Sequence, residues 1–273
     1  MKRTIYLFFL IQTSVSQVFS QEIEMSGILI DSKTQEPVEF VNIGILNKNK
    51  GTISNLEGKF LLEIPKELSK DSLTISHVNY ETLKIPIRDI KDKTLYLEPI
   101  TNELAEVIIS NKKKIHRKVG VKSYNPLLWG SAISKDKDII EIAQRINIPD
   151  KSVKIKYANI YLRRGFEADS IYIRINFYKN MDDAPGEKIV FQNLVQQKRI
   201  EPGWIQMDLT EYDIYLEEDF FIGMEFIPDF KKPLEVWAGG IMTKGGAYSR
   251  RNSQGSWLKS SGAAYSINVE IEY

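Results

Sequence analysis

The sequence predicts an all-β protein made of two β-sandwich domains, an N-terminal seven-stranded one over residues 21–110 and a larger C-terminal one over residues 137–273. Many short runs alternate apolar and polar residues with the two-residue period of a strand. The clearest run is residues 170–178, where isoleucine or phenylalanine fills every second position. Turn-forming clusters such as residues 182–186 separate the runs. Short strands with frequent turns are typical of sandwiches.

Composition narrows the possible functions. The chain has 273 residues, 42% of them hydrophobic and 27% charged, with a net charge of +1. This balance gives no overall field that would attract nucleic acid or an anionic membrane. There is no cysteine and there are only 2 histidines. This inventory excludes thiolate nucleophiles and disulfides and leaves almost no ligands for structural zinc. We therefore expect no cofactor and no metal.

Residues 1–20 have the features of a signal peptide. Lys2 and Arg3 form a positive start, residues 5–11 are apolar, and Val18-Phe-Ser20 offers a small-residue cleavage site before Gln21. A buried N-terminal strand and a membrane anchor are the alternatives, but the apolar run is far shorter than the ~20 residues that a membrane span needs. We expect an exported protein, periplasmic, associated with the outer membrane or extracellular, without a transmembrane segment in its mature chain.

The N-terminal domain is expected to contain seven short strands. Within one of them, Phe60, Leu62 and Ile64 share a face that we expect to be buried, while Leu61 and Glu63 face the other way. The expected strands are residues 23–30, 38–46, 59–64, 72–76, 82–87, 94–97 and 106–109.

The order of small, turn-forming and apolar residues in this domain is similar to that of the carboxypeptidase-regulatory-like (prealbumin-like) domain family. The matching positions are Gly27, Asp31, Pro37, Val41, Gly51, Thr52, Gly58, Phe60, Pro65, Leu73, Ser76, Tyr80, Leu95, Leu97 and residues 104–109. The resemblance implies a seven-stranded sandwich of a kind that accompanies metallocarboxypeptidases and begins many bacterial outer-membrane transporters and surface proteins. Asn55 and Asn79 depart from the family's usual Asp and Gly. Asn tolerates left-handed backbone angles, so the fold is not threatened.

Residues 111–136 are expected to be a linker. The basic run at residues 111–118 suits either a solvated connection or a patch for anionic envelope lipid or glycan. Residues 137–148 fit both a helical stripe and a strand interrupted by Gln144; we favour the strand because the residues that follow are plainly β.

The C-terminal domain is expected to have further strands, and its order of elements weakly resembles jelly-roll modules of the galactose-binding type. The resemblance rests on residues 171–178, 185–187, 204–209 and 220–226. It implies glycan binding or protein contacts. The strands expected in this domain are residues 154–162, 170–178, 204–209, 220–227, 234–238 and 265–272.

Catalytic patterns are missing from the sequence. His77 and His116 lack the acidic partner of a zinc carboxypeptidase pair. Two carboxylates on separate strands would be enough for a glycan-cleaving enzyme, which is the alternative function. The acids considered for it are Asp183, Glu187, Glu217, Glu218, Asp219, Glu225 and Glu235. Asp182 and Asp183 are also open candidates for a Ca²⁺ site, although no EF-hand spacing supports one.

The best candidate ligand-binding loop lies within residues 239–264. This segment is rich in Gly and Ser and contains Tyr248, Arg250, Arg251 and Trp257. Aromatic faces stack on sugar rings and Arg supplies a rigid donor fork. In the alternative, Tyr248 and Trp257 pack into the core. We expect a non-catalytic envelope protein whose C-terminal module binds a glycan or an envelope protein, and no nucleic acid.

Overall fold

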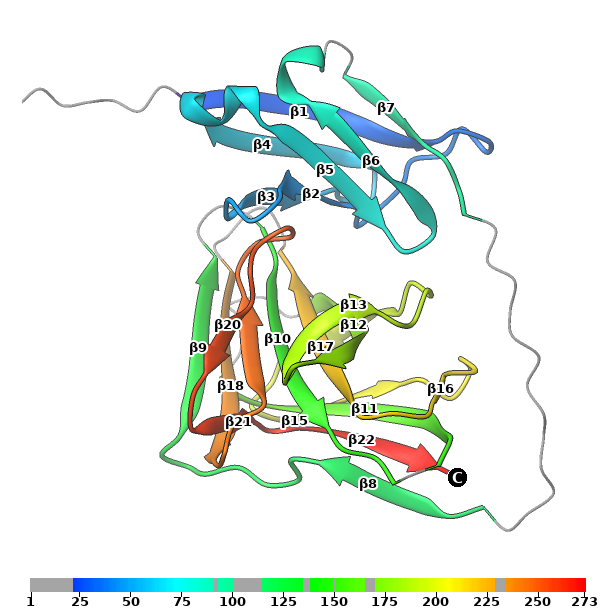
Figure 1. Cartoon of the computed structure of the whole chain (residues 1–273), viewed down its shortest axis with the longest axis vertical. Coiled ribbons are helices and arrows are strands. Elements are labelled where there is room, and N and C mark those ends of the chain that lie inside the picture. The colour runs from blue at the N-terminus through cyan, green and yellow to red at the C-terminus, as the bar shows by residue number, and fades with distance from the viewer. Residues whose placement is uncertain are drawn as a thin grey trace, which may run out of the picture.

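A computed structural model describes residues 22–90, 93–100, 114–134, 138–149, 151–164, 170–228 and 234–273. The predicted signal peptide and the expected strand at residues 106–109 lie outside these ranges. Figure 1 shows a smaller β-sandwich stacked on one end of a larger one. The prediction of an all-β, two-sandwich fold is confirmed. None of the described residues form a helix long and apolar enough to cross a bilayer.

The N-terminal sandwich pairs a three-stranded sheet, ordered β4-β1-β7, with a four-stranded sheet, ordered β3-β2-β5-β6. Its core contains Phe60, Leu62 and Ile64, as their spacing predicts. Two short 3₁₀ helices, η1 (Lys66–Lys70) and η2 (Ile87–Asp89), close its loops. Its strands are β1 (Glu22–Asp31), β2 (Asn42–Ile45), β3 (Lys50–Ile53), β4 (Lys59–Pro65), β5 (Ser72–His77), β6 (Tyr80–Pro86) and β7 (Thr94–Leu97).

Two details of this domain differ from the expectation. Residues 50–53 form strand β3, although the glycine and polar residues there suggest only a turn. The expected strand at residues 38–46 is shorter, because Phe40 has a φ of 54° and breaks the extended backbone before β2. Both differences lie where the domain faces its neighbour.

The C-terminal sandwich has a seven-stranded sheet, here called sheet 1, and an eight-stranded sheet, here called sheet 2. Sheet 1 follows the order β13-β12-β17-β10-β19-β20, with β14 also paired to β12. Its strands are β10 (Ile140–Ile146), β12 (Ser170–Met181), β13 (Ala184–Lys188), β14 (Val195–Arg199), β17 (Phe220–Ile227), β19 (Ala247–Arg250) and β20 (Leu258–Ser260).

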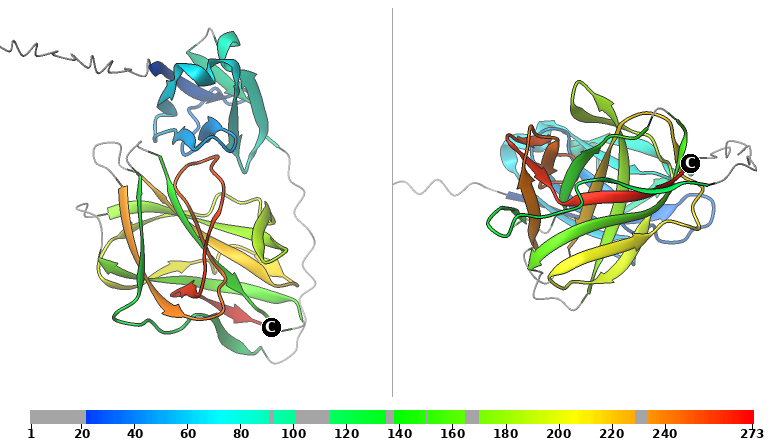
Figure 2. Two further views of the ribbon diagram at one scale, coloured as in Figure 1. Left: turned by 60° about the vertical axis from the view of Figure 1, so that its left-hand side comes forward. Right: turned by 90° about the horizontal axis from the view of Figure 1, so that it is seen from below.

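Sheet 2 follows the order β21-β18-β11-β22-β8, with β15 and β16 paired to β11 and β9 paired to β18. The apolar residues between the two sheets form one continuous core. Figure 2 shows the two layers from other directions. The strands of sheet 2 are β8 (His116–Gly120), β9 (Trp129–Ser134), β11 (Val153–Arg164), β15 (Gly203–Asp208), β16 (Tyr215–Leu216), β18 (Leu234–Met242), β21 (Ala263–Tyr265) and β22 (Ile267–Glu272).

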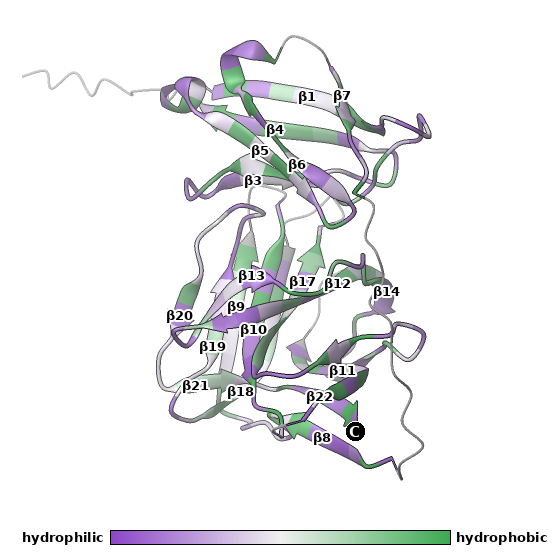
Figure 3. Cartoon of the chain, turned by 45° about the vertical axis from the view of Figure 1, so that its right-hand side comes forward, coloured by the Kyte–Doolittle hydropathy of each residue, from purple (hydrophilic) through white to green (hydrophobic). Residues whose placement is uncertain are grey.

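The linker prediction is wrong for much of residues 111–136. Strand β8 pairs with β22, and β9 pairs with β18, so both belong to the larger sandwich. The basic composition of residues 116–118 suggests a linker, but it belongs to a strand at the edge of a sheet. This strand buries only Val119, so its charged side chains remain in solvent. Figure 3 shows β8 as mostly hydrophilic.

The turn predicted at residues 182–186 is shorter than expected. Asp182 and Asp183 alone turn the chain, with φ values of 51° and 62°. Pro185 and Gly186 already belong to edge strand β13, where the missing proline N–H is tolerated. Strand β10 confirms the favoured alternative for residues 137–148.

The two sandwiches meet through a small apolar cluster of their own. Phe40 and Ile53 from the N-terminal domain pack with Ile139 and Ile227 of the larger one, all at most 3% exposed. The ring of Tyr172 lies 5.0 Å from that of Phe40. This contact resembles a domain core more than a loose linkage, so we expect the two domains to move together.

The loop between β19 and β20 clamps the junction. It reaches up to β2 and β3 in Figure 1. The hydroxyl of Ser253 lies 3.0 Å from the carbonyl oxygen of Thr52, and Gln254 donates its side-chain N–H to the Ser76 hydroxyl at 2.9 Å. Asn47 donates its backbone N–H to the Gln254 carbonyl at 3.0 Å. The middle of the predicted ligand loop therefore serves to hold the two domains together.

Candidate functional site

Tyr248 is buried, but in a small cluster with Ala143, Tyr178 and Phe221 on the outer face of sheet 1 and not in the core between the sheets. It is 6% exposed, and its hydroxyl donates to the Asp183 carbonyl oxygen at 2.6 Å. Its ring meets the edge of Phe221 at 5.5 Å. The structure therefore uses this tyrosine for packing.

Arg250 and Trp257 also make internal contacts. A guanidinium nitrogen of Arg250 lies 2.6 Å from the Glu141 carboxylate, and the guanidinium stands 4.8 Å from the centre of the Trp257 ring. Trp257 in turn meets Tyr178 edge-on. Arg251 alone is exposed. The four predicted residues thus do not form an open platform, because three of them are held by intramolecular contacts.

A buried charge network covers the outer face of sheet 1. Asn176 donates to both Glu141, at 2.9 Å, and Glu225, at 2.8 Å. Arg174 pairs with Glu225 at 2.8 Å and donates to the Phe40 carbonyl oxygen across the domain junction. Both carboxylates are fully buried. The network fixes the sheet and the N-terminal domain relative to each other.

This network contains a carboxylate pair, but it is not arranged for glycan cleavage. Burial opposes ionisation of Glu225, yet the charges of Arg174 and Lys188 outweigh it and lower the pKa of this carboxyl. A general acid for glycoside cleavage needs a raised pKa and access to the sugar. Neither carboxylate reaches solvent. Burial also lowers the pKa of Lys188 to about 8.

The remaining candidate acids are dispersed. Asp183 and Asp219 both accept from Arg145. Glu235 accepts from the Trp237 indole. The other three acids, Glu187, Glu217 and Glu218, are exposed.

Neither histidine nor the acidic turn forms a metal site within the described residues, where no group of three potential ligands occurs. His77 ends β5 with its ring 5.3 Å from that of Tyr80, and burial together with the charge of Arg174 lowers its pKa to about 3. His116 lies 3.7 Å from the Glu272 carboxylate at the surface.

An aromatic surface lies on the outer face of sheet 2. It consists of Tyr124, Trp129, Tyr161, Trp204 and Trp237, which include three of the 4 tryptophans in the chain. Trp129, Trp204 and Tyr124 are each 41–43% exposed. A contiguous group of exposed aromatic side chains on a rigid sheet usually marks a binding surface.

Strand register assembles this surface. Tyr161 lies opposite Trp204, and Gly239 lies opposite Trp129. A Cβ on Gly239 would lie 2.6 Å from the Tyr161 ring. Because glycine has no side chain, the ring can lie directly over this position. Tyr124 stacks on Tyr161 with ring centres 3.8 Å apart and planes at 12°. Strands β9, β18, β11 and β15 lie side by side in this order, so the rings that they carry spread across about 14 Å, or three strand spacings.

Polar groups border the rings. The Arg163 guanidinium lies 4.8 Å from the Trp129 ring centre and donates to the Pro126 carbonyl oxygen. Gln206 donates to Asn159 at 3.1 Å on the neighbouring strands. The surface therefore offers apolar faces with hydrogen-bonding groups beside them.

Sequence reasoning missed this surface, although it carries a detectable signal. Ile205 and Met207 are the buried residues of β15, so Trp204 falls on the outward position. Tyr161 is likewise out of phase with Ile160 and Leu162. Large aromatic residues at outward positions of adjacent strands are the pattern to look for.

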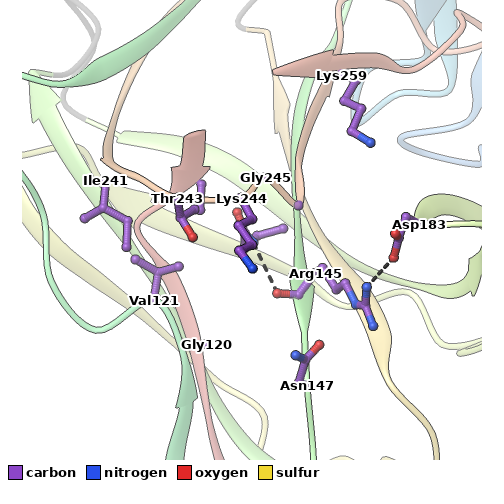
Figure 4. Close-up of a pocket in the computed structure, with 13 residues that line it drawn as sticks. Gly120, Val121, Arg145, Asn147, Asp183, Ile241, Thr243, Lys244, Gly245 and Lys259 are labelled. Atoms are coloured by element: carbon purple, nitrogen blue, oxygen red, sulfur yellow. Dashed lines mark hydrogen bonds and ion pairs between the residues drawn. The ribbon is translucent and has the colours of Figure 1, made fainter. Parts of the chain in front are cut away.

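A pocket of about 520 Å³ opens at the edge of the larger sandwich (Figure 4). Its wall is formed by β10, the end of β8 and the β18–β19 turn. Its charged side chains are Arg145, Asp183, Lys244 and Lys259. The volume is in the range of small-molecule sites.

A model of the CarboxypepD_reg-like domain family matches residues 25–109. Over these residues the chain is similar to a carboxypeptidase-regulatory-like domain. The resemblance predicted from the sequence is thereby confirmed for this domain. No curated protein matches the chain.

Solved structures of limited similarity include the cysteine protease and lectin-like domains of Cwp84, a surface layer associated protein of Clostridium difficile. That comparison has 9% identity and a TM-score of 0.44, and covers 85% of this chain and 58% of that one. The same protease after propeptide cleavage gives 11% identity and a TM-score of 0.42, with 90% and 70% covered. The structure of the infectious bursal disease virus Gt strain has 8% sequence identity and a TM-score of 0.32, and the comparison covers 92% of this chain and 62% of that one. These low scores carry no functional argument.

Proposed function

We propose that this chain is an exported, non-catalytic envelope protein that binds a glycan on the aromatic surface of its C-terminal sandwich. The aromatic surface is the observation that carries the proposal. Export is supported by the predicted signal peptide at residues 1–20. The carboxypeptidase-regulatory-like domain acts as a scaffold that fixes the binding module.

The chemistry of the surface suits a saccharide. Sugar rings present C–H faces that pack on aromatic rings, and their hydroxyls need donors and acceptors at the border. Trp129 and Trp204 provide exposed faces, while Arg163 and Gln206 provide polar groups beside them. Four of the five rings project from paired strands, and Tyr124 is stacked on one of them, so little side-chain entropy is lost on binding.

The location of the N-terminal domain leaves this surface open. That domain packs on sheet 1 through Phe40 and Arg174, whereas the aromatic surface belongs to sheet 2, the other layer of the sandwich. A ligand on sheet 2 therefore does not compete with the domain junction.

Glycan and peptidoglycan arrays probed with residues 21–273 test the proposal. We expect retention of at least one oligosaccharide, and we expect Trp129→Ala and Trp204→Ala each to weaken it about five-fold, near 1 kcal/mol. Tyr96→Ala is the matched control, because Tyr96 is an aromatic residue of the N-terminal domain whose side chain is 52% exposed.

Two results would contradict the proposal. One is that no glycan is retained. The other is that the tryptophan variants bind as the native chain does. If the surface instead captures a purified envelope protein and no glycan, the ligand class is wrong and the surface is a protein interface.

A further inference from the structure

We propose that the pocket at the edge of the larger sandwich is a second binding site, one that takes a sugar bearing an acidic group. The pocket is lined by side chains and backbone from several separate segments, and the aromatic surface contributes none of its lining residues. The inference therefore stands independently of the proposed function of that surface.

Charge is the first argument. Arg145 is offset by Asp183 and Asp219, to which it donates. Lys244 and Lys259 bring the net charge of these five groups to +1, and the only contact of either lysine with a described side chain is that of Lys259 over the Tyr248 ring, at 5.8 Å. Both lysines are exposed, so binding an anion between them carries little desolvation cost.

The second argument is a donor that is already buried and unused. The Nε of Arg145 has no hydrogen-bond partner among the described residues although it is buried. An unpaired buried N–H is costly. This nitrogen is closed to solvent, whereas the side chain as a whole is 32% exposed, so an acceptor in the pocket would reach Nε only after a movement of the guanidinium. The Asp183 contact in Figure 4 holds the guanidinium at the pocket wall.

The third argument is that the pocket keeps its shape. Gln144 accepts the Tyr265 backbone N–H at 2.8 Å and donates to the Arg145 carbonyl oxygen at 3.2 Å. Gly246 has a φ of 100°, and a Cβ there would lie 2.9 Å from the Gln144 amide nitrogen. Glycine is therefore required where the β18–β19 turn presses on β10.

The polar side chains of the pocket suit a ligand that is larger than a simple anion and carries hydroxyl groups. Asn147 and Thr243 are exposed at the pocket and supply an amide and a hydroxyl. A volume of about 520 Å³ far exceeds that of an inorganic ion. Together with the lysines, these groups suit a hydroxylated ligand with a carboxylate or phosphate.

Isothermal titration of residues 21–273 with galacturonate oligomers, glucose 1-phosphate, neutral glucose oligomers and inorganic phosphate tests the inference. We expect one of the two acidic sugars to bind at least ten-fold more tightly than the neutral oligomer and than phosphate. The carboxylate and phosphate arms distinguish the source of the negative charge. The titrations are repeated with Trp204→Ala, which weakens the aromatic surface, and the preference for the acidic sugar should persist in that variant.

Two double variants test the role of the lysines. One, the alanine pair, combines Lys244→Ala with Lys259→Ala, and the other, the conservative arginine pair, combines Lys244→Arg with Lys259→Arg. The alanine pair should weaken the acidic sugar at least ten-fold without lowering the melting temperature, and the arginine pair should retain it. Lys84→Ala is the matched control, because Lys84 is exposed on the N-terminal domain. Equal binding of acidic and neutral sugars, equal binding of phosphate, an unaffected alanine pair, or no binding at all would each overturn the inference.

Discussion

Ser253 donates its backbone N–H to the Asp138 carboxylate at 2.9 Å, and its single hydroxyl faces both that carboxylate and the Thr52 carbonyl oxygen. One hydroxyl proton cannot serve two acceptors. When Asp138 is protonated, it donates to the Ser253 oxygen, and the hydroxyl proton is then free for Thr52. Burial raises the pKa of Asp138 to about 6, in agreement with this arrangement.

The first prediction concerns pH. In the unfolded chain Asp138 has a pKa of 3.8, so between pH 3.8 and about 6 the folded state holds more protons. The contribution of this group to stability is therefore present at low pH and is lost as pH rises through that window, by roughly 3 kcal/mol. Urea unfolding from pH 3 to 7.5 measures it.

Asp138→Asn provides the comparison, because an amide can donate to Ser253 as the protonated acid does. We expect the variant to lack this part of the pH dependence and to be at least as stable as the native chain at pH 7.5. A variant with the same pH profile as the native chain would exclude Asp138 as the titrating group.

The second prediction concerns the buried ion pair of Arg174 and Glu225. Removing only the cation leaves a buried carboxylate poorly compensated, so Arg174→Met should lower the free energy of unfolding by about 3–5 kcal/mol. The double variant with Glu225→Leu should lose less, because no unpaired charge remains. Chemical denaturation of both variants checks this. A double variant less stable than Arg174→Met would contradict the account.

The third prediction concerns the core of the regulatory-like domain. Phe60 is 6% exposed on β4, and Phe60→Ala should cost roughly 3–5 kcal/mol. Leu61, the next residue, is 39% exposed, so Leu61→Ala should change stability far less. Thermal melts of the pair measure the difference, and equal melting temperatures would refute the assignment of faces.

The fourth prediction concerns Gly239 beneath Tyr161. A methyl group at this position would meet the ring at 2.6 Å, so Gly239→Ala should displace Tyr161 and the stacked Tyr124. Glycan retention should fall several-fold while the chain stays folded. Ser72→Ala, at an exposed position of β5 in the N-terminal domain, is the control. Unchanged retention by Gly239→Ala would show that the ring arrangement does not matter.

The sequence by itself determined the all-β class, most strands and the regulatory-like domain, because these depend on local alternation and turn chemistry. Phe60, Leu62 and Ile64 reveal their common face through spacing alone. Edge strand β8 escaped prediction because a strand that buries a single apolar residue has almost no periodic signal.

Only the tertiary structure decided which side chains meet. Tyr248 and Arg250 have the composition of a ligand loop, but strand pairing with β10 places Arg250 beside Glu141 and turns it to internal use. Trp129 and Trp204 are 75 positions apart in the sequence and come onto one surface through the register of β9, β18, β11 and β15. Such long-range pairing depends on the packing of whole sheets, which no local pattern encodes.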